Sequence, residues 1–329
     1  MGVQNAPEFA CLPLKINLGN FMEARELGAD TIIMAGGVGP CRFGLYAQLE
    51  KEILEDLGCH YEILVLEPPE RGIIDFFKKI RKLTEKVSWW RIIQGVRLGY
   101  KKACFVDKLE ILVQEIRPRE NELGTADKIF AHSLKTIDKA NNLDELAEAY
   151  GLAKEKLLHI PRNEEKEVLK IGLVGEIYTL LEPFASQDIE KRLGYLGAQV
   201  TRSLYLSEWI NEHLFGGLLS GAVRQGFSKH AGPFLNHFVG GHARESIGAG
   251  VLLAGEGFDG IVQVAPLTCM PEIVAHSIFP SVSDTLDIPV LTIYVDELSG
   301  QEGIHTRLEA FIDLLWGKRF SLDHEKTIC

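Results

Sequence analysis

The chain has 329 residues, of which 46% are hydrophobic and 25% are charged, and its formal net charge is -11. This length is enough for two domains, and the composition is that of an ordinary globular protein. The negative balance argues against nucleic acid as the main partner. No apolar run approaches the roughly 18 residues that span a bilayer, and no basic-then-apolar signal begins the chain, so we expect a cytoplasmic protein without a membrane partner.

Six cysteines are too few and too scattered for a disulfide scaffold in a chain of this length. We therefore expect free thiols, some of which do metal or redox work. The cysteines are Cys11, Cys41, Cys59, Cys104, Cys269 and Cys329.

The first 66 residues predict alternating helices and strands. Apolar runs at 31–35 and 61–66 are typical of buried strands, and helices are expected at about 16–27 and 42–57. Pro13 fits the first turn of the earlier helix. This order predicts an α/β domain with a parallel sheet.

Residues 71–141 carry apolar side chains at helical spacing over most of their length, which predicts a helical insertion. Four aromatic side chains there, Phe76, Phe77, Trp89 and Trp90, make the insertion more apolar than a solvent-exposed helical cap needs to be. Because a large exposed apolar patch would otherwise remain, we expect a homodimer.

The second half repeats the rhythm of the first, after a helix that begins at Asn142 and a charged segment at 161–167. We place the boundary there, between an N-terminal α/β domain (1–165, with its insertion) and a C-terminal α/β domain (166–329). The expected strands cover 168–174, 199–204, 260–265 and 289–295. The expected helices cover 186–196, 206–228, 242–254, 272–279 or slightly further, and 304–315, and residues 321–329 carry no structural signal.

Three cysteines share one setting. Cys41 follows a predicted strand and a glycine-rich turn and precedes a helix; Cys269 follows a strand and also precedes a helix; Cys11 precedes a helix. Parallel α/β folds place their chemistry at the carboxyl ends of strands, and a helix N-terminus favours a thiolate. We predict that these three are metal ligands, whereas Cys59 and Cys104 are small buried hydrophobes and Cys329 belongs to the tail.

The cysteine spacing favours one kind of metal site over another. It contains no CxxC pair or Cys/His cluster of the kind that holds structural zinc. Thiolates from distant loops, flanked by glycine and proline, are more typical of an iron–sulfur cluster. Three cysteines on a [4Fe-4S] cluster leave one iron with another ligand, which is water, hydroxide, a nearby side chain or substrate.

Other chemical motifs are weak. The order of glycines at 36–39 does not meet the dinucleotide fingerprint, and neither a P-loop nor a GxSxG elbow occurs. The stretch 230–245 holds three histidines, and its glycines Gly240 and Gly241 permit close approach to a ligand. We interpret the carboxylates near predicted strand ends as caps or surface groups; they are Glu176, Glu256, Asp296 and Glu297.

Four separated segments resemble the 2-hydroxyacyl-CoA dehydratase superfamily, and more closely its shorter, CoA-enzyme-activase-related branch and its double-cubane cluster relatives. The segments are 11–15 (CLPLK), 36–44 (GGVGPCRFG), 174–178 (VGEIY) and 266–271 (PLTCMP). The resemblance implies two flavodoxin-like parallel-sheet domains with helical additions and an oxygen-sensitive [4Fe-4S] cluster between them. Cys11, Cys41 and Cys269 match its cysteine-bearing motifs.

The resemblance also implies a partner and a substrate. The partner is an ATP-hydrolysing activator of the actin-like kinase fold that supplies low-potential electrons, and the substrate is an acyl-CoA or another small molecule. Three functions stay open: an iron–sulfur dehydratase-like or reductase-like enzyme or carrier, a non-catalytic cluster-binding subunit, and a cluster-free small-molecule binding protein.

Overall fold

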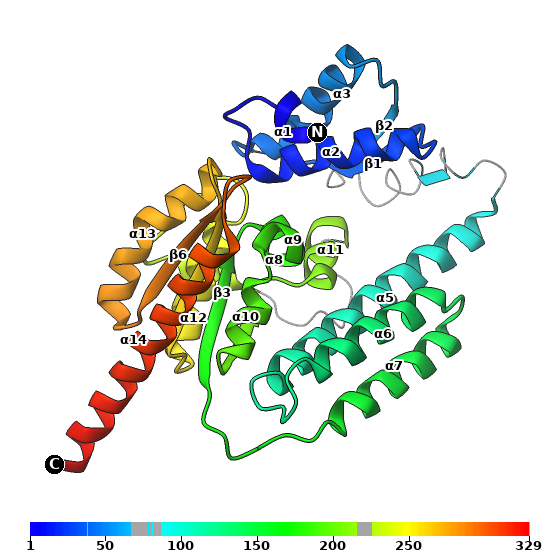
Figure 1. The fold of residues 1–329 in the computed structure, drawn as a ribbon. Helices are drawn as coiled ribbons and strands as arrows, with labels where there is room; N and C mark the ends of the chain where they lie inside the picture. Colours follow the sequence, from blue (N-terminus) through cyan, green and yellow to red (C-terminus); the bar gives the residue numbers. More distant parts are fainter. Residues whose placement is uncertain are drawn as a thin grey trace.

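The computed structural model describes residues 1–37, 39–66, 78, 80, 81, 84, 87–215 and 226–328, without the side chains of 213, 214 and 322–328. These residues form an α/β fold with two separate sheets, and every strand pairing within both sheets is parallel. The prediction of parallel α/β structure on either side of 161–167 is therefore confirmed. Figure 1 shows the arrangement of the elements.

The N-terminal segment, residues 1–66, contains the smaller sheet. Its elements are α1 (Gly2–Asn5), α2 (Leu12–Glu26), β1 (Thr31–Ala35), the 3-10 helix η1 (Arg42–Leu45), α3 (Tyr46–Asp56) and β2 (Glu62–Leu66). β1 and β2 pair in parallel from Thr31 opposite Glu62 to Ala35 opposite Leu66. Helix α2 begins four residues earlier than expected, because Pro13 occupies its first turn. Leu18 and Leu54 pack into the small core between the helices and the sheet.

Three long helices follow, α5 (Trp89–Ile116), α6 (Thr125–Lys139) and α7 (Leu143–Leu158). They share a core of their own that includes Leu109 and Leu146. Asn142 starts α7 as expected: its Oδ1 accepts from the backbone N–H of Glu145, whose carboxylate accepts from the N–H of Asn141. Phe76 and Phe77, and the start of the predicted insertion, lie outside the described residues.

The larger sheet has the strand order β4-β3-β5-β6. Its strands are β3 (Leu169–Gly175), β4 (Ala198–Arg202), β5 (Gly260–Pro266) and β6 (Val290–Val295). The sheet is buried on both faces: Leu193 and Leu308 lie in the core on one side, and Ile247 and Phe279 in the core on the other.

The helices around this sheet are α8 (Ile177–Leu181), α9 (Pro183–Ser186), α10 (Ile189–Tyr195), α11 (Leu206–Phe215), η2 (Phe227–Ala231), α12 (Ala243–Gly255), α13 (Met270–Leu286) and α14 (Gln301–Ile328). Three expectations about them are wrong. The helix expected at 186–196 is α10 alone, since Gln187 and Asp188 adopt left-handed backbone angles. The helix expected at 206–228 does not reach its end, because Gly226, with φ +89°, precedes the separate 3-10 helix η2; residues 216–225 lie outside the described residues. The helix expected at 304–315 is longer, since α14 runs from Gln301 to Ile328.

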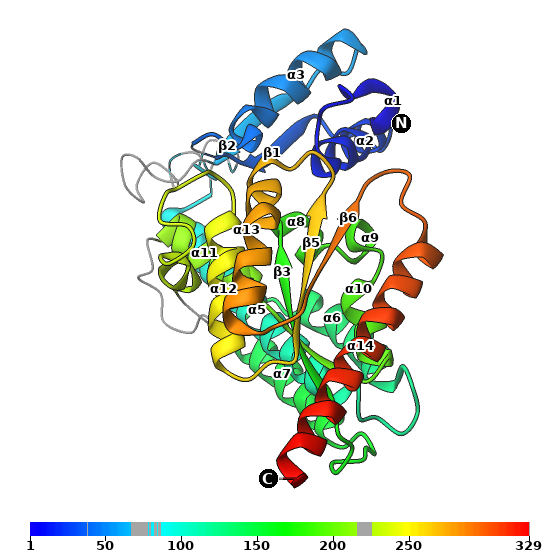
Figure 2. The ribbon, with the colours of Figure 1, turned by 90° about the vertical axis from the view of Figure 1, so that its left-hand side faces the viewer.

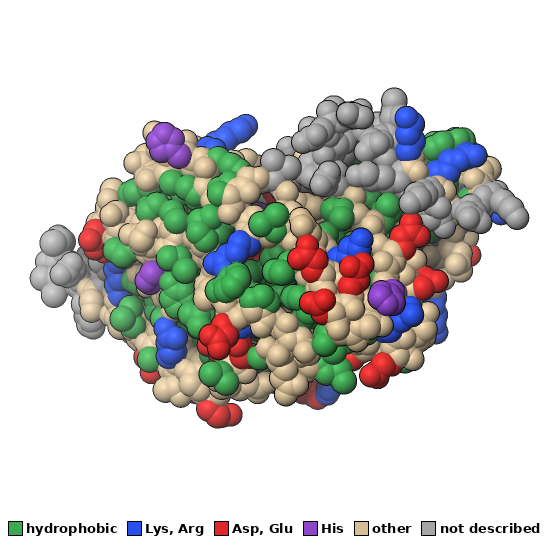
Figure 3. All heavy atoms as spheres, turned by 90° about the horizontal axis from the view of Figure 1, so that it is seen from above, with side chains coloured by type: hydrophobic (Ala, Val, Ile, Leu, Met, Phe, Trp, Pro, Cys, Tyr) green, Lys and Arg blue, Asp and Glu red, His purple; other side chains and the backbone are tan. Residues whose placement is uncertain are grey.

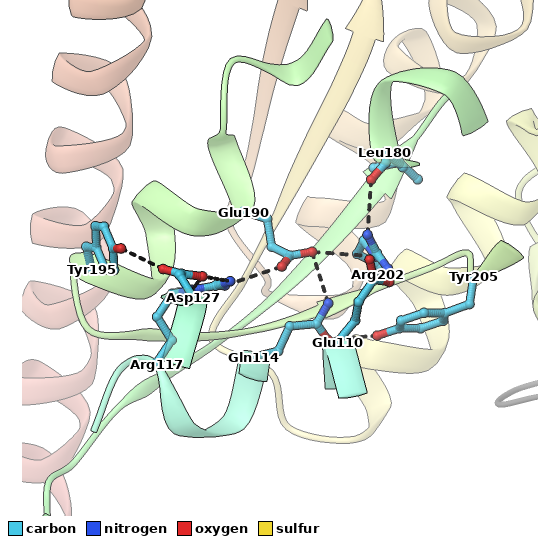
Figure 4. Close-up of polar contacts among 9 residues, drawn as sticks. All are labelled: Glu110, Gln114, Arg117, Asp127, Leu180, Glu190, Tyr195, Arg202 and Tyr205. Carbon is cyan, nitrogen blue, oxygen red and sulfur yellow. Dashed lines mark hydrogen bonds and ion pairs between the residues drawn. The ribbon is translucent and has the colours of Figure 1, made fainter. Parts of the chain in front are cut away.

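A buried polar network joins the long helices to the edge strand β4 (Figure 4). Arg202 on β4 pairs with Glu110 of α5 and, at 3.5 Å, with Glu190 of α10. Arg117 of α5 bridges Glu190 at 3.3 Å and Asp127 of α6 at 2.7 Å. The long helices are thus fixed to the larger sheet.

The strands β3 and β5 of the larger sheet point toward the N-terminal segment (Figure 2). This segment therefore lies over the carboxyl ends of these strands. Lys15 of α2, only 8% exposed, pairs at 2.7 Å with Glu297, just after β6. Throughout the described part of the chain, no helix has the length and apolar character that crossing a bilayer requires. The edge beneath the N-terminal segment is where parallel sheets place their functional residues.

Candidate functional site

Each of the three predicted ligand cysteines is the N-cap residue of a helix. Cys11 precedes α2, Cys41 precedes η1 and Cys269 precedes α13, all with extended backbone angles. None uses its side chain to cap the helix. The three thiols therefore lie at element ends, and the backbone N–H groups of Phe43 and Glu272, in the helices that follow, interact with Cys41 and Cys269.

The structure brings the three cysteines into one neighbourhood. Cys11 interacts electrostatically with both Cys41 and Cys269, and each of the three also interacts with Glu176. Cys269 is buried, while Cys11 and Cys41 are half-buried. Whether they bind metal stays a prediction, but their convergence from three separate loops is a property of the fold.

Helix ends favour the thiolate at Cys41 and Cys269, where the backbone N–H groups of Phe43 and Glu272 lower the pKa, but burial outweighs this effect. Burial raises the pKa of Cys11, of Cys41 and, most strongly, of Cys269, and the carboxylate of Glu176 adds to the increase. Desolvation has the larger effect because removing a thiolate from water costs more free energy than the N-terminus of one helix supplies by stabilising the negative charge. The free site therefore holds thiols, and metal binding must release protons.

Arg42 ties the three cysteine loops together. Its Nη1 donates to the carbonyl oxygen of Phe9, two residues before Cys11, and its Nη2 donates to that of Thr268 at 2.9 Å, one residue before Cys269. The residue directly after Cys41 thus joins the loops that carry the other two. This hydrogen-bond pattern fixes the relative positions of loops that lie far apart in the sequence.

Tyr46 forms the wall of the site behind Cys11. Its ring is 4% exposed, and its hydroxyl shares a short hydrogen bond with the Cys11 Sγ. Burial and this neighbour both raise the pKa of Tyr46, so the phenol keeps its proton. The sequence gives no signal for this contact, since nothing in the spacing indicates a partner 35 residues away.

Two glycines let a neighbouring loop approach Cys41. A Cβ on Gly240, whose φ is +87°, would lie 2.7 Å from the backbone N of Cys41. A Cβ on Gly241 would lie 2.8 Å from Pro271 and 3.8 Å from the Cys41 Sγ. The two glycines therefore allow close packing against the cysteine loops, while the expected approach to a ligand stays a prediction. His230 and His237, from the same stretch, are exposed.

Glu176 faces the cysteines from the end of β3. A Cβ on the preceding Gly175 would lie only 2.0 Å from the carbonyl oxygen of Val264, so glycine is required where the chain turns. The Glu176 Oε2 caps α8 by accepting from the N–H of Thr179 at 3.1 Å, as expected of a cap. Desolvation raises its pKa to about 7. Its place beside all three thiols is the feature that the sequence did not reveal.

A second carboxyl lies deeper, behind Cys269. Glu272 is fully buried and accepts hydrogen bonds from Ser246 at 2.9 Å and from Gln263 at 2.8 Å. Burial raises its pKa to about 7. These bonds hold the first turn of α13, and with it Cys269, against β5.

The remaining cysteines lie elsewhere. Cys59 packs against the core of the N-terminal segment, and Cys104 is buried in α5 beside Tyr100. Cys329 lies outside the described residues. Neither Cys59 nor Cys104 adds to the cysteine site.

Within the described ranges, no three His, Cys, Asp or Glu side chains are grouped as a single metal ion would require. Cysteine thiolates are the usual ligands of iron–sulfur clusters, so the chemistry of the three cysteines is compatible with one. That they bind a cluster stays a prediction.

A scan against models of protein families finds no match for this chain, and no curated protein matches its sequence. The resemblance to the dehydratase superfamily therefore depends on the four sequence segments.

Proposed function

We propose that this chain is an iron–sulfur protein in which Cys11, Cys41 and Cys269 hold one [4Fe-4S] cluster for low-potential electron transfer or for reductive or dehydratase chemistry. The observation that carries the proposal is the convergence of these three N-cap cysteines, held together by Arg42. All three belong to segments that resemble the cysteine motifs of the dehydratase superfamily.

The cluster would be held by three thiolates, with one iron left for another ligand. When bound, it would supply one-electron chemistry and an exchangeable coordination position. Glu176 interacts with all three thiols, so its carboxylate is our candidate for the protein group nearest that position. Tyr46 would hold Cys11 in place through its hydroxyl.

The remaining proposals follow the resemblance. The two halves, 1–165 and 166–329, would be flavodoxin-like domains of a cytoplasmic protein, and the reductant would be an ATP-dependent activator of the actin-like kinase fold. An acyl-CoA or another small molecule would be the substrate.

Anaerobic purification tests the function most simply. We expect a brown protein with about four iron and four acid-labile sulfide per chain, and an electron paramagnetic resonance signal after reduction. A chain that binds neither iron nor sulfide, even after anaerobic reconstitution, would instead support a cluster-free binding protein.

Turnover separates the two cluster-binding alternatives. If the loaded protein converts an acyl-CoA only with a reduced activator and ATP, it is an enzyme. If it carries the cluster but turns nothing over, the non-catalytic subunit is the better description.

A further inference from the structure

A cavity of about 340 Å³ lies within the N-terminal segment and reaches Cys11. It is built from two stretches only, the residues around the start of α2 and those of η1 and α3. Its lining residues are Phe9, Ala10, Cys11, Leu14, Arg42, Leu45, Tyr46, Gln48, Leu49 and Glu52. Neither Cys269 nor Glu176 lines the cavity.

The cavity has a buried floor and an open rim. Ala10, Leu14 and Tyr46 are 4%, 2% and 4% exposed and form the floor, while Phe9 and Leu45 are each 62% exposed at the rim. Exposing two large apolar side chains to water around a pocket is energetically unfavourable unless a ligand or partner covers them. The size is at the lower end of the range for small-molecule pockets, about 300–1,000 Å³.

The two charged side chains of the cavity have opposite signs, and both already have hydrogen-bond partners. Arg42 donates to two backbone carbonyls, and Glu52 accepts from Gln48 at 3.1 Å. The lining therefore offers no unbalanced charge to a charged ligand. Seen from above, the molecule shows acidic and basic side chains interspersed with hydrophobic ones (Figure 3).

We propose that this cavity binds a small, uncharged and mainly apolar molecule whose single polar group reaches the Tyr46 hydroxyl and the Cys11 thiol. The aliphatic part would pack on Leu14 and Leu49 and be covered by Phe9. The occupant would touch one of the three site cysteines from a direction independent of the other two. This inference does not depend on the proposed cluster, because Cys41, Cys269 and Glu176 do not line the cavity.

The test uses the metal-free full-length protein and the uncharged probe N-phenyl-1-naphthylamine. We expect a saturable rise in its fluorescence when it binds. Hexan-1-ol should reverse this rise, and hexanoate should reverse it about tenfold less effectively. The difference is expected because the hexanoate carboxylate would lose its hydration in a cavity that offers no unbalanced cation. No saturable binding to the wild-type chain would overturn the proposal. Equal competition by the two compounds would overturn the assignment of an uncharged ligand.

Variants at Leu49 test whether the probe binds in this cavity. Leu49→Trp fills it and should weaken probe binding about tenfold, whereas Leu57→Trp, on the same helix but outside the cavity, should leave it unchanged. Leu49→Ala enlarges the cavity and should still bind the probe, which keeps the test valid if the larger side chain perturbs folding. Unchanged binding by a folded Leu49→Trp protein would contradict the proposal.

Protection of Cys11 from alkylation tests whether the occupant contacts this cysteine. Saturating hexan-1-ol should slow iodoacetamide modification of Cys11 about fivefold, as located by peptide mass spectrometry, because an occupied pocket excludes the reagent. Cys59, which is half-buried outside the cavity, serves as the control and should react at its original rate. Equal protection of both cysteines, or of neither, would contradict contact between the ligand and Cys11.

Discussion

Arg42 donates a hydrogen bond of 2.9 Å to the backbone carbonyl of Thr268, across 226 residues of sequence. Thr268 adopts a left-handed backbone conformation with φ +69°, which few non-glycine residues do without a constraint. The same guanidinium reaches the carbonyl of Phe9. Arg42 therefore joins the N-terminal segment to the loop of Cys269, in addition to the pair between Lys15 and Glu297.

Replacing Arg42 by lysine should loosen this arrangement, because an ammonium group on a flexible stem cannot replace the planar fork. We expect the free energy of unfolding of the metal-free protein to fall by about 1–3 kcal/mol, the usual value of hydrogen bonds from a charged donor. Iron uptake on anaerobic reconstitution should fall with it. Arg25→Lys, which affects one exposed hydrogen bond to Ala29, is the control. An Arg42→Lys protein as stable as the control would show that the arginine does not hold the loops.

Glu50 predicts a pH-dependent stability. It is fully buried in α3, and burial raises its pKa to about 8, with only partial compensation from Asn17. Because the folded protein holds this proton more tightly than the unfolded chain, the free energy of unfolding falls as pH rises from about 4.5 to about 8.

Glu50→Gln removes this titration without changing the size of the side chain. It should leave stability nearly unchanged at pH 4.5 and raise the free energy of unfolding by roughly 1–3 kcal/mol at pH 8. Denaturant unfolding at both pH values measures the difference. Glu55→Gln, on the exposed face of the same helix, should show no such growth with pH. A constant difference between Glu50→Gln and wild type would contradict a buried, protonated carboxyl.

Arg202 should be among the most sensitive positions outside the cysteine site. It is 4% exposed and balances Glu110 and Glu190, and burial raises the pKa of Glu110 to about 6 even beside the guanidinium. Arg202→Met leaves Glu110 without its guanidinium partner and Glu190 with Arg117 alone, and breaking a buried pair in this way typically costs about 3–5 kcal/mol. Lys128→Met, at an exposed pair, should change stability by less than about 1 kcal/mol. Similar losses in both variants would show that the network is not a major support of the fold.

The exposed aromatic side chains at the start of α5 support the proposed homodimer. Trp89 and Trp90 are 43% and 68% exposed, and Ile93 nearby is 44% exposed. We expect a dimer mass by light scattering at micromolar concentration, and a monomer for Trp90→Glu, since a charge in an apolar interface is costly. Leu298→Glu, at an isolated exposed leucine, should stay dimeric. A monomeric wild-type chain would rule the dimer out.

Local patterns predicted most of the elements. The strand at 31–35 and the cap at Asn142 depend on neighbours in sequence, and both occur where their patterns place them. The interruption at Gln187 and Asp188 could not be foreseen, because neither residue type demands a left-handed conformation. The length of α14 was missed since its last turns lack a clear apolar face.

The site could be predicted only in part, because its partners come from distant segments. The three cysteines were chosen from their common setting between an element end and a helix. The sequence does not reveal that Arg42 reaches Thr268, that Tyr46 faces Cys11 or that Glu176 interacts with all three thiols, since these contacts are set by how the N-terminal segment lies on the larger sheet. The raised thiol pKa values likewise depend on burial in three dimensions.

The most direct test is the iron content of single cysteine variants, measured after anaerobic reconstitution. We expect wild type and Cys59→Ala to bind about four iron per chain, and Cys41→Ala or Cys269→Ala to lose the cluster or retain clearly less iron, because each removes one of three thiolate ligands. Circular dichroism confirms that the metal-free variants fold. Full retention of a four-iron cluster in folded Cys41→Ala or Cys269→Ala would contradict the assignment of these cysteines as ligands.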